Sequence, residues 1–263
     1  MKKILIPTDF SESASKALEY ALALAEITSA KIYLLNTYAI PHAGATMMVS
    51  IDDLLKHEST KNLAKEEAKI KESRPSLEVS SYCLAGSLDS VLPDFCVDNG
   101  IDLIVMGTTG ASGWQGKLFG SNTANLIGSV KCPIIAIPFE SKISKPCNII
   151  ISTDLKTANN AAVYEPVKLL ATILGSSVRY VHITTKDNTM ELRSLENDFG
   201  NEVDFVYEDD IEQGLDNYIS VNKVDLLVIV AKKHGFFEKL FNPSISKKLA
   251  KELTIPMLFL YQE

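Results

Sequence analysis

Residues 105–138, VMGTTGASGWQGKLFGSNTANLIGSVKCPIIAIP, hold the pattern that decides the fold. The stretch opens inside an apolar run, residues 101–106, that contains a single aspartate and is typical of a buried strand. Glycines follow at 107, 110 and 120, then a short helical pattern over residues 121–130 and a second apolar run at residues 134–138. A strand, a glycine-rich loop and a helix start together present backbone N–H groups to an anion. The stretch therefore predicts a strand–loop–helix–strand unit that binds an anion.

The spacing of these glycines, G-x2-G-x9-G-S, differs from two common phosphate-binding loops. A Walker loop needs Ser or Thr after Gly116-Lys117, where Leu118 stands, and a dinucleotide fingerprint needs glycines at tighter spacing. In this spacing and in the elements that flank it, the chain resembles the nucleotide-binding members of the universal stress protein family. The alternative is that the three glycines only mark loops and a helix end.

Composition narrows the class of protein. The chain has 263 residues, 46% of them hydrophobic, and a net charge of −7, which argues against a general nucleic-acid surface. Its four cysteines show no C-x-x-C spacing, and no segment approaches the roughly 20 apolar residues that a membrane span needs. We expect a soluble, cytoplasmic protein with reduced thiols.

Short apolar runs alternate with helical patterns along the first half. The first helix has a narrow, alanine-rich apolar face and is capped by either Ser11 or Asp9, whereas residues 39–50 show no clear period. Strands alternating with helices predict parallel strands with right-handed crossovers. Strands are expected at residues 4–6, 31–35, 79–83, 101–106 and 134–138, and the later helices at residues 52–73, 87–97 and 121–130.

The second half repeats the first. Thr8-Asp9 recurs as Thr153-Asp154 at a shift of 145, and IDLIVMG from residue 101 recurs as VDLLVIV from residue 224, at a shift of 123. In the second strand of each copy, His182 takes the place of Asn36. The repeat predicts an α/β protein of two tandem domains, residues 1–140 and 146–263. Each is an open, doubly wound, mainly parallel five-stranded sheet with helices on both faces.

The glycine loop is degenerate in the second copy. At the shift of 123 only Ser121 keeps its residue type, as Ser244. A branched valine and a proline cannot allow the same close approach or backbone freedom, so we expect no nucleotide to bind there in the same way. Lysines near this loop are either simply solvated or attract another anion. The replacements are Gly107 by Val230, Gly110 by Lys233 and Gly120 by Pro243, and the lysines are Lys232, Lys233 and Lys239.

Ligands of open α/β sheets bind at the carboxyl ends of the strands. The resemblance implies an adenine nucleotide, ATP or AMP, at that edge of the first copy. Asp9 would accept hydrogen bonds from ribose hydroxyls, unless it only caps the first helix, and main-chain groups near Thr37 would meet the adenine. The residues after the loop would donate to phosphates. The full predicted site is Pro7, Thr8, Asp9, Thr37, Met106, Gly107, Thr108, Gly110, Gly120, Ser121, Asn122 and Thr123.

Neither a catalytic constellation nor a metal-ligand set stands out in the sequence. The histidines His42, His57, His182 and His234 have no metal-ligand spacing with one another or with the cysteines. A Mg²⁺ ion could accompany the phosphates at Asp9. The resemblance implies a stress-response regulatory protein that binds nucleotide with little or slow turnover. The alternatives are an ATP hydrolase or phosphotransferase, and an interaction scaffold with an empty pocket; the protein partners are not predicted.

Each copy ends in an apolar strand, residues 134–138 and 257–261, that is last in its sheet. Bare hydrophobic edges favour strand pairing. The resemblance implies that the two edges pair within one chain as a pseudo-dimer, and a homodimer of whole chains is the alternative.

Overall fold

The computed structural model describes residues 1–38, 45–108, 120–127, 129–153, 161–184, 203–232 and 254–262. Its first half runs strand, helix, strand, as the sequence predicts. The elements are β1 (Lys3–Pro7), α1 (Glu12–Thr28), β2 (Lys31–Tyr38), α2 (Ala45–Ser73), β3 (Val79–Ala85), α3 (Leu88–Asn99), β4 (Leu103–Gly107), α4 (Ser121–Leu126) and β5 (Ile134–Ile137).

Two of these helices differ from their predicted bounds. Helix α2 begins at Ala45, although the sequence shows no helical period before residue 52. Helix α4 ends at Leu126, not at residue 130, because Ile127 turns to an extended backbone with φ −64° and ψ 123°. Leu126, Ile127 and Val130 are all buried, so packing against the sheet determines the end of this helix.

The second half repeats this order of elements. Its strands and helices are β6 (Asn148–Ser152), the 3-10 helix η1 (Ala161–Tyr164), α5 (Glu165–Leu174), β7 (Ser177–Thr184), β8 (Val203–Tyr207), α7 (Ile211–Val221), β9 (Leu226–Lys232) and β10 (Met257–Gln262).

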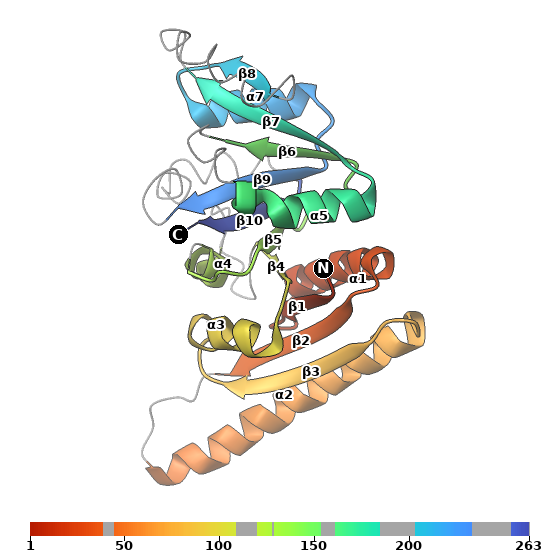
Figure 1. The fold of residues 1–263 in the computed structure, drawn as a ribbon. Coiled ribbons are helices and arrows are strands. Elements are labelled where there is room, and N and C mark those ends of the chain that lie inside the picture. Colours follow the sequence, from red (N-terminus) through yellow and green to blue (C-terminus); the bar gives the residue numbers. More distant parts are fainter. Residues whose placement is uncertain are drawn as a thin grey trace.

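All ten strands form one twisted sheet, in the order β3-β2-β1-β4-β5-β10-β9-β6-β7-β8 (Figure 1). Within each half the strands are parallel, and counted along its own chain each half has the order 3-2-1-4-5. The order reverses between β1 and β4, which creates the crevice where doubly wound sheets bind ligands. The predicted fold class is confirmed.

The register of the strands reproduces both sequence shifts. Ile4 pairs with Leu103 in the first half, and Ile149 pairs with Leu226 in the second. These pairs differ by 145 and 123 residues (149 − 4 and 226 − 103). The sequence repeat is therefore a repeat of strand pairing.

A repeated aspartate fixes the start of the first strand in each half. The carboxylate of Asp102 accepts hydrogen bonds from the backbone N–H groups of Lys2 and Lys3, at 2.6 and 3.0 Å. Asp225, 123 residues later, accepts from the backbone of Cys147 and Asn148 at 3.0 and 2.8 Å. This contact accounts for the aspartate that interrupts both apolar runs.

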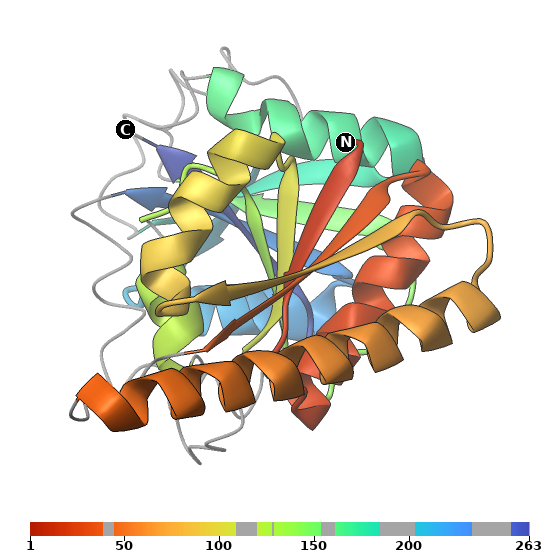
Figure 2. The same ribbon diagram turned by 90° about the horizontal axis from the view of Figure 1, so that it is seen from below.

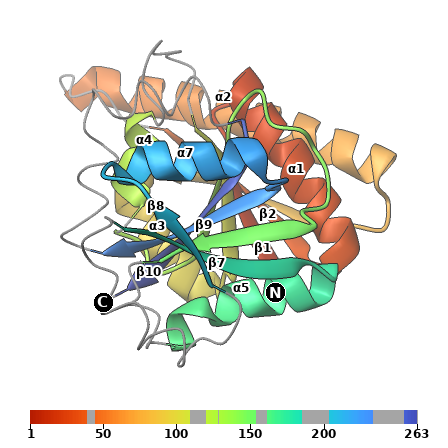
Figure 3. The same cartoon turned by 90° about the horizontal axis from the view of Figure 1, so that it is seen from above.

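Helices cover both faces of the sheet. Ile4 and Ile6 point into a core with α1, α2 and α5, while Leu5 between them points into a second core with α3, α4 and α7. Figure 2 shows α1 and α3 on opposite sides of the first-half strands, and Figure 3 shows α5 and α7 on opposite sides of the second-half strands. Strands buried on both faces explain the continuous apolar runs in the sequence.

The two halves join edge to edge, as the pseudo-dimer hypothesis predicts. β5 pairs antiparallel with β10, with Ile135 opposite Leu258 and Ile134 opposite Phe259. All four side chains are at most 2% exposed. The apolar edge of each half is thus covered within one chain.

Candidate functional site

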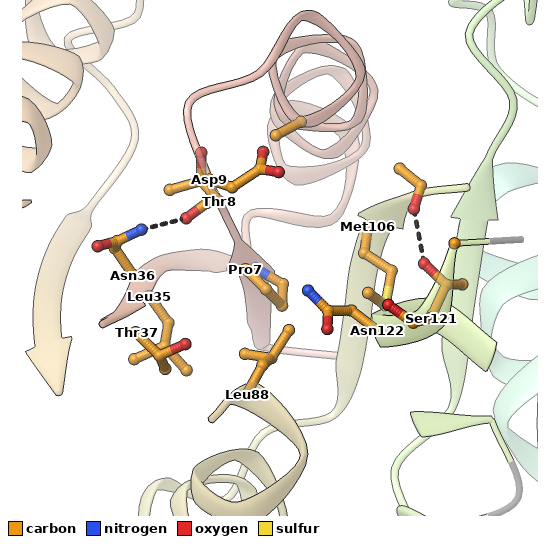
Figure 4. Close-up of a pocket in the computed structure, with 14 residues that line it drawn as sticks. Pro7, Thr8, Asp9, Leu35, Asn36, Thr37, Leu88, Met106, Ser121 and Asn122 are labelled. Atoms are coloured by element: carbon orange, nitrogen blue, oxygen red, sulfur yellow. Dashed lines mark hydrogen bonds between the residues drawn. The ribbon is translucent and has the colours of Figure 1, made fainter. Parts of the chain in front are cut away.

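A cavity of about 260 Å³ lies at the carboxyl ends of β1, β2 and β4, beside the start of α4 (Figure 4). It sits at the crevice where the strand order reverses. Asp9 is the sole ionisable side chain among the described residues of its lining. The lining consists of Pro7, Thr8, Asp9, Ala14, Leu35, Asn36, Thr37, Leu88, Met106, Gly107, Gly120, Ser121, Asn122 and Thr123.

Ten of the twelve residues that the sequence predicts for the site line this cavity. Thr108, which follows Gly107 in the chain, is buried and not part of the lining, and its N–H donates to the Ile137 carbonyl at 3.0 Å. Gly110 lies outside the described residues. The sequence analysis did not assign to the site four residues that also line the cavity: Ala14, Leu35, Asn36 and Leu88.

A tight turn after β1 presents Asp9 to the cavity. The Thr8 hydroxyl accepts a hydrogen bond from the N–H of Phe10 at 3.0 Å, and Asp9 Oδ1 accepts from the N–H of Ser11 at 3.1 Å. Phe10 has a left-handed backbone with φ +61°, which is uncommon for a bulky residue. Backbone strain of this kind concentrates at functional sites.

The structure decides which residue caps α1. The Ser11 hydroxyl accepts from the N–H of Ala14 at 3.2 Å, so Ser11 is the N-cap. The exposed Asp9 therefore precedes the cap and belongs to the lining of the cavity.

Asn36 connects the ends of β1 and β2. Its side-chain Nδ2 donates to the Thr8 carbonyl at 2.6 Å, as the dashed line in Figure 4 shows. Its Oδ1 accepts from the hydroxyl of Ser59 in α2, also at 2.6 Å. The signal for Asn36 in the sequence is a polar residue placed directly after the apolar run that ends at Leu35.

Gly107 lies where a side chain has no room. A Cβ atom built on it would lie 2.3 Å from Ser13 Oγ and 2.8 Å from the Ser13 carbonyl oxygen in the first turn of α1. The glycine thus lets β4 and α1 approach closely beside the cavity.

Hydrogen bonds connect the two described ends of the glycine loop. The N–H of Gly120 donates to the Thr108 carbonyl at 2.6 Å, and the hydroxyl of Thr123 donates to the Gly107 carbonyl at 2.9 Å. The Thr123 hydroxyl, which the sequence assigned to a phosphate, is therefore used to close the loop.

The start of α4 faces the cavity. Ser121 and Asn122 are exposed and line it, and the first N–H groups of a helix have no acceptor within the helix. In Figure 4 the Asn122 side chain points toward Pro7. The cavity thus offers an anion backbone and hydroxyl donors, and its described lining holds no cation.

The equivalent region of the second half keeps the strand contacts and changes the glycine. The Thr153 N–H donates to the Val181 carbonyl at 3.0 Å, as Thr8 does to Leu35 at 2.9 Å. His182 Nδ1 lies 2.8 Å from the Thr153 carbonyl, the contact that Asn36 makes in the first half. Val230 stands in place of Gly107. The other replacements of the loop and Asp154 lie outside the described residues.

No helix in the described part of the chain is both long and apolar enough to cross a membrane. Among the same residues, no group of three or more His, Cys, Asp or Glu side chains is placed to hold a metal ion.

Sequence relatives match about half of the chain. Universal stress protein MJ0531 from Methanocaldococcus jannaschii is 30% identical over 142 residues, which cover 52% of this chain and 81% of that protein. Universal stress protein MJ0577 from the same organism is 27% identical over 154 residues, which cover 52% of this chain and 94% of that protein.

A solved structure matches both halves together. A universal stress protein from Archaeoglobus fulgidus aligns over 99% of this chain and 96% of its own, with a TM-score of 0.73 and 20% identity. This likeness extends the tandem fold to the whole chain. The sequence pattern described as the Universal stress protein family matches residues 1–138, so the chain belongs to the universal stress protein family and carries two copies of its fold in tandem.

Proposed function

We propose that the first half binds one adenine nucleotide, ATP or AMP, in the cavity, and that the chain acts as a nucleotide-dependent regulatory protein in stress adaptation. The observation that carries this proposal is the lining of the cavity. The motif residues from β1, β2, β4 and α4, which are distant in the sequence, meet around one crevice.

Each part of the nucleotide has a matching surface in the cavity. The half-buried Leu88 provides apolar contact for the base, and the main chain at Thr37 provides polar groups for its edge. The Asp9 carboxylate accepts from ribose hydroxyls or holds a Mg²⁺ ion beside the phosphates. The N–H groups and hydroxyl at the start of α4 donate to the phosphates.

Slow turnover follows from the chemistry of the lining. Asp9 is the sole ionisable group among the described lining residues, so no pair of a general acid and a general base can be assigned. Positioned acid–base groups typically contribute about 10²–10⁴-fold in rate. A hydrolase or phosphotransferase is the alternative, and it requires turnover far above the uncatalysed rate.

The second half should bind no nucleotide in the same way. Val230 brings a branched side chain to the position where Gly107 allows close approach, and Pro243 lacks the N–H of Gly120. We therefore expect one site per chain.

Titration calorimetry of the full chain with ATP tests the proposal. One site per chain is expected, and two equal sites would contradict it. Gly120→Pro should abolish binding, because it removes the N–H that closes the loop on Thr108 and puts the proline ring against the Thr108 carbonyl oxygen, which now lies 2.6 Å from that nitrogen. Pro243→Gly is the matched control and should create no second site. If no nucleotide binds, and none is released from the denatured protein in mass spectrometry, the scaffold alternative holds.

A further inference from the structure

A polar chain leads from the cavity into helix α2. The Ser59 hydroxyl donates to Asn36 Oδ1 at 2.6 Å, and Asn36 Nδ2 donates to the Thr8 carbonyl at 2.6 Å. The first of these bonds connects α2 to a side chain that lines the cavity.

The partners of Asn36 fix the orientation of its side-chain amide. A carbonyl oxygen only accepts hydrogen bonds, so the NH₂ group of Asn36 must face Thr8 and its oxygen must face Ser59. Ser59 is only 6% exposed, so its hydroxyl needs this partner. Loss of the Ser59 hydroxyl would remove the hydrogen-bond donor of the Asn36 oxygen. The amide would then be held only by its bond to the Thr8 carbonyl.

The second half makes the equivalent strand contact with a histidine. His182 reaches the Thr153 carbonyl at 2.8 Å from the position equivalent to Asn36. Asn36 serves two partners at once, because its amide donates to the Thr8 carbonyl and accepts from the Ser59 hydroxyl. The second of these contacts runs to α2.

Helix α2 is placed to transmit a change at the cavity. Figures 1 and 2 both show its start extending past the arrowhead of β3, beyond the carboxyl edge of the sheet. Leu54 in this part is 63% exposed, and Asp53, Lys56 and His57 are exposed as well. Exposed side chains such as these bury little surface, so the local stability of this part of the helix is sensitive to single hydrogen bonds.

We infer that Ser59 is a positioning residue that acts through Asn36 to couple nucleotide occupancy of the cavity to the order of the exposed start of α2. The inference rests on the proposed function. A nucleotide that contacts Thr8, Asp9 and Thr37 holds the end of β1 in place, and the hydrogen bonds through Asn36 and Ser59 pass this restraint to α2. By linkage, the bond to Ser59 must favour nucleotide binding by the same factor by which the nucleotide favours the bond.

Hydrogen exchange of the full chain, with and without ATP, tests the coupling. In the wild type, ATP should slow exchange of the α2 amides around Ser59. Ser59→Ala should lose this protection and bind ATP roughly 2- to 10-fold more weakly, the range for one net hydrogen bond. Ser59→Thr keeps the hydroxyl and should keep the protection.

Thr60→Ala is the matched control. Thr60 is exposed on the next position of α2, and its hydroxyl donates within the helix, to the Lys56 carbonyl at 2.7 Å. This variant should match the wild type in affinity and in ATP-dependent protection. Wild-type behaviour of Ser59→Ala, or equal losses in both variants, would overturn the coupling while nucleotide binding stands. A wild type that binds no ATP would instead overturn the proposed function, and the coupling with it.

Discussion

Gly107→Ala tests whether close packing of β4 on α1 shapes the cavity. The new Cβ would lie 2.8 Å from the carbonyl oxygen of Ser13 and 3.0 Å from its carbonyl carbon, both in the backbone of α1. Ordinary contact begins at 3.4 Å, so α1 and β4 must separate by about 0.6 Å (3.4 − 2.8). Side-chain rotation of Ser13 relieves the contact with its Oγ but leaves the backbone contacts in place.

This separation should lower both stability and nucleotide affinity. Overpacking typically costs about 1–3 kcal/mol. At roughly 2–4 °C per kcal/mol for a chain of this size, Tm should fall by about 2 to 12 °C. Nucleotide affinity should fall as well, because the first turn of α1 follows directly from the turn that carries Asp9. Thermal unfolding and ATP titration of the same preparations measure the two effects.

Gly175→Ala separates the two effects. Gly175 caps α5 in the second half with φ +63°, and a Cβ there has no atom within 4 Å. The substitution should lower Tm through backbone strain of roughly 1–2 kcal/mol and leave nucleotide affinity unchanged.

Ser13→Ala gives a second comparison. Ser13 is 6% exposed, and its hydroxyl has no hydrogen-bond partner among the described residues, so this substitution alone should not destabilise the protein. Combined with Gly107→Ala, it should recover only part of the lost Tm, since the backbone contacts persist. Wild-type Tm and affinity in Gly107→Ala, or full recovery in the double variant, would refute the reasoning.

Three further outcomes are expected. Asp9→Ala should weaken ATP binding about 10- to 150-fold, the range for a charge-assisted hydrogen bond, in calorimetry; normal binding with loss of a fast single-turnover hydrolysis rate would make Asp9 catalytic. Hydrogen bonds from Lys71 and then Ser81 lower the pKa of Glu67. Its charged form therefore stabilises the fold above the unfolded-state pKa of about 4.3. This contribution is lost as the pH falls through the lower folded-state pKa. The Tm difference between wild type and Glu67→Gln should accordingly be present at pH 7 and shrink below about pH 4; a difference that does not vary with pH would contradict this. Residues 1–140, proposed as one domain, should self-associate in sedimentation through the uncovered β5, whereas a monomer would count against pairing through this edge.

The strands could be predicted because most are short runs of mainly apolar residues in the sequence. Residues such as Ile4, Leu5 and Ile6 are all fully buried, and a run with both faces covered is visible without any partner. The repeat predicted that the second half has the strand order of the first, and its shifts of 145 and 123 recur in the register of the paired strands. The pairing of β5 with β10 was predicted instead from the two apolar edges and the family resemblance. The start of α2 was missed, because residues 45–51 carry no helical period and sequence reasoning had no other signal there.

The cavity was predictable where backbone geometry demands a residue type. A glycine is needed at position 107 because its neighbours leave no room for a side chain. Thr8 and Asp9 could be predicted because the same two residues recur after the first strand of the second copy. Leu88 belongs to a helix that starts far from these residues in sequence, and only the packed sheet brings it to the cavity. The left-handed backbone of Phe10 could not be predicted, because nothing in its residue type favours it.

The junction between β5 and β10 affects how the protein is made. These strands lie at the centre of the ten-stranded sheet, yet 123 residues separate their starts (257 − 134). During synthesis the first half can fold as a unit before the ribosome has made β10, the partner of β5. For that interval a nascent chain displays a bare apolar edge, and two nascent chains on one message could pair through it. Translation speed and chaperone supply should therefore affect the yield of folded protein.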